Sequence, residues 1–170
     1  MFVDLFHTKK LRLALIYAAV AILVQFLQDT LFARMTVFGT HMLFVPGVCA
    51  AVGFQEGGFR GGLYGLLAGL LCDMTFAENT VMFTVLFPIL GFVSGLAAEF
   101  LMNRSYPGFL VTAVACMLLT GLTQMLPVLA LQPGALFHCV LTVILQTLVS
   151  IPVVALLYFP IEQISGRFRA

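Results

Sequence analysis

Long apolar runs, each close to the length that crosses a bilayer, follow one another along the whole chain. A spanning helix needs about 20 apolar residues, and charges, prolines and glycines mark where each run stops. The runs predict six helices, at 11–32, 37–54, 59–76, 80–102, 109–131 and 136–161. Because backbone that faces lipid must satisfy its own hydrogen bonds, runs of this length favour helices throughout. We therefore expect an all-α, polytopic protein that forms a single integral membrane domain over residues 1–170.

The composition excludes a water-soluble domain. Of 170 residues, 62% are hydrophobic and 9% are charged, whereas soluble domains are about half apolar and about one-quarter charged. The net charge of +1 shows no basic excess, so nucleic acid is not an expected partner. The apolar composition makes the lipid bilayer the expected surroundings. The first run is longer than the apolar core of a signal peptide, and we expect an uncleaved helix.

The distribution of basic residues predicts the orientation. With six spans, seven of the eight lysines and arginines lie on one side of the membrane, and Arg34 alone lies on the other. The seven are Lys9, Lys10, Arg12, Arg60, Arg104, Arg167 and Arg169. Loops rich in lysine and arginine stay in the cytoplasm, so both termini are expected there.

Glycines recur at intervals of four in the third and fourth predicted spans. The first series is followed by Asp73 and the second by Glu99. The glycines are Gly57, Gly61, Gly65 and Gly69, then Gly91 and Gly95. A helix face without side chains lets another backbone approach closely, which holds membrane helices together. The favoured interpretation is packing within the chain, and a groove for a partner helix is the alternative.

Carboxylates inside membrane helices are candidates for functional sites because burying a charge in lipid is costly. Asp73 and Glu99 lie near the ends of their predicted spans, and Asp29 lies near the end of the first. Each is either an interfacial anchor or a specific contact with another helix.

The last two predicted spans carry polar residues at intervals of four. They are Thr112, Cys116, Thr120 and Gln124 on one helix, and His138, Thr142, Gln146 and Ser150 on the other. We expect these stripes to face each other and to form hydrogen bonds between the helices. The alternative is a polar cavity that holds a small solute, with His138 as a titratable group.

Sequence motifs for catalysis are missing. The chain contains neither HExxH nor GxxxxGK[ST], and its three histidines share no metal-ligand spacing. We therefore expect no enzyme activity, no metal and no cofactor. The four cysteines lie in apolar runs without a CxxC spacing and are interpreted as small apolar side chains.

Two segments resemble the rod-shape-determining membrane protein family MreD. One is Gln28-Asp29-Thr30-Leu31-Phe32, which leads through Val37-Phe38-Gly39 into the second span. The other is Glu56-Gly57-Gly58 followed by Gly61, Gly65 and the run from Leu66 to Asp73. The resemblance covers about residues 25 to 105. It implies a non-enzymatic scaffold of the bacterial elongation machinery, which directs side-wall peptidoglycan synthesis and maintains rod shape.

The resemblance also implies partners. The direct partner is an MreC-like protein with one membrane span. The indirect partners are MreB filaments, RodA and a class B penicillin-binding protein.

The length, the span count and the third-span pattern are also similar to the substrate-binding membrane subunits of energy-coupling-factor vitamin transporters, whose fold resembles that of MreD. In that alternative, Ala14 and Ala18 dock the coupling subunit, and the polar stripes of the last two spans line a vitamin pocket.

Overall fold

The computed structural model describes residues 2–28, 30, 44–75, 81–100, 105–131, 134 and 136–169, and this part of the chain contains helices and no strand. The helices are α1 (Phe2–Leu27), α2 (Val45–Glu56), α3 (Gly58–Thr75), α4 (Met82–Phe100), α5 (Tyr106–Leu131) and α6 (Leu136–Arg169). The expectation of an all-α protein is confirmed for these residues.

Three of these helices are long and apolar enough to cross a membrane. They contain the segments Met82–Phe100, Tyr106–Ala130 and Leu136–Gln163, and α1 adds a shorter apolar stretch, Leu15–Leu27. Large apolar side chains such as Phe26, Leu63 and Leu148 are exposed on the outside of the helices. A surface of this kind is stable in lipid and not in water, so the chain has the character of a membrane protein.

The short helix α2 forms the centre of the structure. Every residue from Val45 to Gln55 is buried, and α2 contacts α3, α4, α5 and α6. Its 12 residues are about 18 Å long, which is less than the thickness of about 30 Å of a bilayer's hydrocarbon core. The helix is therefore surrounded by protein and not by lipid.

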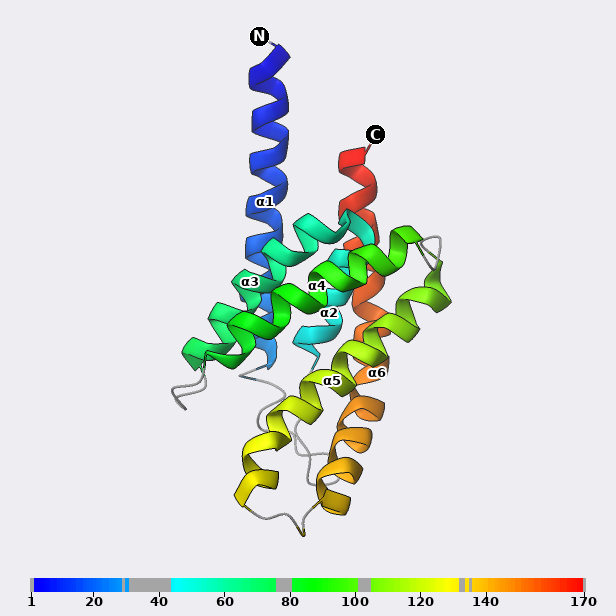
Figure 1. The fold of residues 1–170 in the computed structure, drawn as a ribbon. Coiled ribbons are helices and arrows are strands. Elements are labelled where there is room, and N and C mark those ends of the chain that lie inside the picture. Colours follow the sequence, from blue (N-terminus) through cyan, green and yellow to red (C-terminus); the bar gives the residue numbers. More distant parts are fainter. Residues whose placement is uncertain are drawn as a thin grey trace.

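The other helices are arranged around α2 (Figure 1). In this view α1 and α6 stand upright, and the N- and C-terminal ends of the chain lie at the same end of the molecule. The antiparallel pair α3 and α4 crosses in front of α2 obliquely. Because α3 and α4 share the most extensive contact between any two helices, they form a tight hairpin against α2.

Several helix boundaries differ from those expected. Helix α1 begins at Phe2 and not at residue 11, and α6 continues to Arg169, beyond the expected end at 161. Apolar runs stop at charged residues, whereas a helical backbone can continue past them into water. Residues 37–43 of the expected second span lie outside the described residues. Helices α2 and α3 are separated by Gly57 alone, which has a φ of 93°. This left-handed conformation favours glycine and turns the chain sharply.

Candidate functional site

Three glycines from three different helices meet at one point, which we call the glycine junction: Gly53 of α2, Gly61 of α3 and Gly91 of α4. A Cβ atom added to Gly61 would overlap with the Cα of Gly53 and with the carbonyl oxygen of Gly91. A Cβ on Gly53 or on Gly91 would in turn overlap with backbone atoms of the other helices. The three backbones are therefore in direct contact, an approach that only glycine permits.

The two glycine stripes predicted from the sequence pack against each other along the α3–α4 contact. A Cβ on Gly65 would overlap with backbone of Phe87, and a Cβ on Gly69 would overlap with backbone of Phe83. Gly95 of α4 lies in the same way against the backbone of Gly58. These positions are thus used for contacts between helices of this chain.

Gly57 differs from the rest of its predicted stripe because it forms the corner before α3 and does not lie in the helix. Glu99, which is exposed near the end of α4, lies beside this corner: a Cβ added to Gly57 would be 3.0 Å from its Oε1 atom. The carboxylate is therefore near the N-terminal end of α3, where a negative charge is stabilised by the helix dipole.

Asp73, at the end of α3, caps the first turn of α4. Its carboxylate accepts hydrogen bonds from the backbone N–H groups of Phe83 at 3.2 Å and Thr84 at 2.8 Å, and from the Thr84 hydroxyl. The first N–H groups of a helix have no partner within the helix, and an acidic side chain also interacts favourably with the positive end of the dipole. Asp73 therefore fixes the α3–α4 hairpin at the end opposite Glu99.

Gln28, just beyond α1, provides the corresponding cap for α2. Its Oε1 atom accepts hydrogen bonds from the backbone N–H groups of Phe44 and Val45, both at 3.2 Å. One turn earlier, Gln25 accepts a hydrogen bond from the Cys72 thiol at 3.2 Å. The polar cluster near the end of the first predicted span therefore joins α1 to both α2 and α3. Asp29, the acidic candidate in this cluster, lies outside the described residues.

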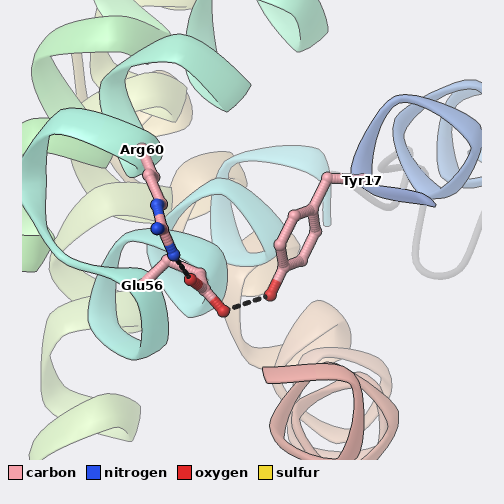
Figure 2. A network of polar contacts seen from close by, with 3 residues as sticks. All are labelled: Tyr17, Glu56 and Arg60. Atoms are coloured by element: carbon pink, nitrogen blue, oxygen red, sulfur yellow. Dashed lines mark hydrogen bonds and ion pairs between the residues drawn. The ribbon is translucent and has the colours of Figure 1, made fainter. Parts of the chain in front are cut away.

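A buried carboxylate links three helices at the opposite end of α2 (Figure 2). Glu56 accepts a hydrogen bond from the hydroxyl of Tyr17 in α1 at 2.8 Å and forms an ion pair with Arg60 of α3. The Glu56 side chain is only 2% exposed, whereas that of Arg60 is 49% exposed. Because an unpaired buried carboxylate is strongly unfavourable, Tyr17 and Arg60 compensate for the burial of Glu56.

The threonine hydroxyls of the polar stripes in α5 and α6 form hydrogen bonds within their own helices. The hydroxyls of Thr112, Thr120 and Thr142 donate to the carbonyl oxygens four residues earlier in their own helices, at 2.8–2.9 Å. A threonine hydroxyl reaches this carbonyl without any partner helix, so regular spacing does not imply cross-helix bonding. Thr142 is also only partly buried.

The other members of these stripes differ in burial. Gln146 and Ser150, in the middle of α6, are buried, whereas Gln124 is partly exposed and His138 is exposed. A side-chain contact joins the two helices near the middle of the stripes, where a Cβ on Gly121 would lie 2.7 Å from a methyl group of Val143. The burial of the stripes therefore varies along their length.

No group of three or more His, Cys, Asp or Glu side chains in the described part of the chain could hold a metal ion. The four cysteines are buried and unbridged. Within the described residues, polar side chains cap α2 and α4 and form the Glu56–Arg60 ion pair, contacts that fix these helices relative to one another.

Sequence reasoning missed Gly53 and the role of Tyr17. Gly53 had a usable signal, since it extends the four-residue spacing of Gly57, Gly61, Gly65 and Gly69 by one step. Tyr17 had none, because its partner Glu56 is 39 residues away.

Comparisons with known proteins identify no relative: no family model, no curated protein and no solved structure matches this chain.

Proposed function

We propose that this protein is a non-enzymatic scaffold of the bacterial cell-elongation machinery, of the MreD kind. In this proposal the chain crosses the cytoplasmic membrane six times with both termini inside. It binds an MreC-like single-span protein directly. Its contacts with MreB filaments, RodA and a class B penicillin-binding protein are indirect.

The observation that carries the proposal is where the MreD-like residues lie. Gln28 caps α2, Glu56 joins three helices, and Asp73 caps α4. Gly61 and Gly69 lie in backbone contacts between α3 and neighbouring helices. Residues that carry a resemblance and build the centre of the fold favour a shared architecture over a chance match in composition.

The chemistry of the interior favours a scaffold over an enzyme. The polar side chains of the α1–α4 region bind helix ends or one another, and the sequence has no catalytic motif. A bundle held in this way presents a firm outer surface, which is what a scaffold needs in order to position its partners.

The six-span arrangement has two supports. Both ends of the chain lie at the same end of the molecule in Figure 1, as an even number of crossings requires. The bias of seven basic residues to one is the second support. Cysteine at Gly166, in a background without native cysteines, should resist an impermeant maleimide in intact cells. Cysteine at Gln132 should react, and labelling of Gly166 would contradict the proposal.

The function is tested in the organism that encodes the chain. The tagged protein, expressed at its native level and extracted in mild detergent, should recover an MreC-like single-span protein. A tagged membrane protein of similar size and abundance serves as the control. Depletion should make rods widen and become round.

The same experiment separates the transporter alternative. A vitamin-binding subunit should retain a vitamin-sized molecule through purification, and its loss should create a nutritional requirement while cell shape stays normal. Normal rods after full depletion would refute the scaffold function.

A further inference from the structure

Two layers of polar groups mark the ends of the α2–α3 region. At one end, Gln25 binds Cys72, so the Gln28 cap of α2 and the adjacent Asp73 lie at a similar level. At the other end, the buried Glu56 carboxylate pairs with the half-exposed guanidinium of Arg60. Of these groups, Arg60 and Asp73 reach the outer surface of α3, and they mark the ends of its lipid-facing apolar stretch.

The two layers are close together. Arg60 and Asp73 are 13 residues apart in one helix, which corresponds to about 20 Å along its axis. In contrast, the apolar segment of α6 contains 28 residues, or about 42 Å. The hydrocarbon core of a typical bilayer, about 30 Å, is longer than the first distance and shorter than the second.

The length of the Arg60 side chain does not compensate for the short apolar length of α3. A lysine or arginine near a helix end normally extends its charged group toward the headgroups. The guanidinium of Arg60 instead pairs with Glu56, which holds it at the level of the α2–α3 corner. The oblique course of α3 in Figure 1 shortens its height further relative to the upright α6.

The face of α3 between these layers is suited to acyl chains. Leu63, Leu66, Leu67 and Leu70 are all exposed between Arg60 and Asp73. Beyond the two polar residues, Phe59 and Met74 are exposed at the two ends of the helix.

The geometry points to a bilayer that is thinner beside α3 than beside α6, with phospholipids of short or compressed acyl chains as the occupants of the α3 face. A bilayer thins around an apolar surface shorter than itself, because exposing polar groups to hydrocarbon costs more than the deformation. The inference rests on the six-span part of the proposed function, in which α3 crosses the bilayer, and not on the scaffold role.

Single tryptophans test the inference because the chain contains none. Phe59→Trp and Met74→Trp place an indole at each end of α3. Phe137→Trp and Phe159→Trp place one near each end of the apolar segment of α6. All four positions are at least half exposed. The α3 pair spans 15 residues, or about 22 Å, and the α6 pair 22 residues, or about 33 Å.

Each full-length variant is reconstituted in dioleoyl-phosphatidylcholine vesicles that contain lipids spin-labelled either near the headgroup or near the chain end. Protection of the buried native cysteines from a thiol reagent verifies folding. All four indoles should be quenched more strongly by the shallow label. Stronger quenching of either α3 indole by the deep label would overturn the inference, as would the absence of quenching at both, which would indicate a protein partner on this face.

Lipid sorting provides a second measurement. Leu67→Trp and Leu148→Trp lie on exposed faces of α3 and α6. In equal mixtures of 14-carbon and 22-carbon phosphatidylcholines with only the shorter lipid brominated, quenching at residue 67 should exceed quenching at residue 148. Equal quenching, or stronger quenching at residue 148, would overturn the inference.

Discussion

The α2–α4 region and the α5–α6 pair are held together by different means. In α2–α4, backbone touches backbone at glycines, and polar side chains reach from one helix to cap another. In α5–α6, the glycine contact is made with the side chain of Val143 and not with backbone, and the threonine hydroxyls bond within their own helices. The first region is fixed by direct backbone contacts and by caps that reach from helix to helix, whereas the glycine contact of the second keeps the two backbones one side chain apart.

The largest expected effect is at the glycine junction. Gly61→Ala places a methyl group against backbone atoms of α2 and α4, neither of which can yield without moving a helix. We expect a loss of about 3 kcal/mol or more in the free energy of unfolding, at the upper end of overpacking effects. Titration of the folded fraction with sodium dodecyl sulfate in mixed micelles measures it.

The neighbouring Gly62→Ala is the matched control. Its methyl group would be 3.6 Å from the carbonyl oxygen of Pro88, an ordinary contact, and alanine favours a helix by about 1 kcal/mol. Stability should be unchanged or slightly higher. Equal losses for Gly61→Ala and Gly62→Ala would mean that the junction is not the rigid point described.

An intermediate effect is expected for Asp73→Ala. The substitution removes the cap of α4 while leaving the glycine contacts intact, and loss of a cap costs about 1 kcal/mol. Asp73→Asn, which keeps one acceptor oxygen, should recover part of the loss. If both variants unfold with the stability of the unmodified protein, the cross-helix cap has no energetic role.

The smallest effect is expected in the α5–α6 pair, at Thr120→Val. Thr120 is fully buried, but its hydroxyl binds only the Cys116 carbonyl of its own helix, and valine has nearly the same shape. The free energy of unfolding should change by less than about 0.5 kcal/mol. A loss of 1 kcal/mol or more in the same titration would favour the cross-helix hydrogen bonds expected from the sequence.

The sequence allowed good prediction where one spacing has one physical consequence. Glycines at every fourth position must lie on one face of a helix, so the contact surfaces containing Gly61, Gly65 and Gly91 could be located. Threonine spacing is ambiguous, because the hydroxyl of Thr142 can bind its own helix as readily as another. The Tyr17–Glu56 bond was beyond prediction, since it depends on how α1 crosses α2.

Because α2 is buried largely by helices that follow it in the chain, its packing can be completed only late in synthesis. Spans enter the membrane one by one and then associate, yet α2 is covered by α4, α5 and α6, all of which follow it in the chain. At ribosomal rates, the roughly 100 residues between Glu56 and the end of the α6 apolar segment take on the order of 5 to 20 s to emerge. During that interval α2 lacks most of the helices that bury it in the finished protein. We therefore expect nascent chains of this protein to depend on the insertion machinery to shelter α2 until α6 is made.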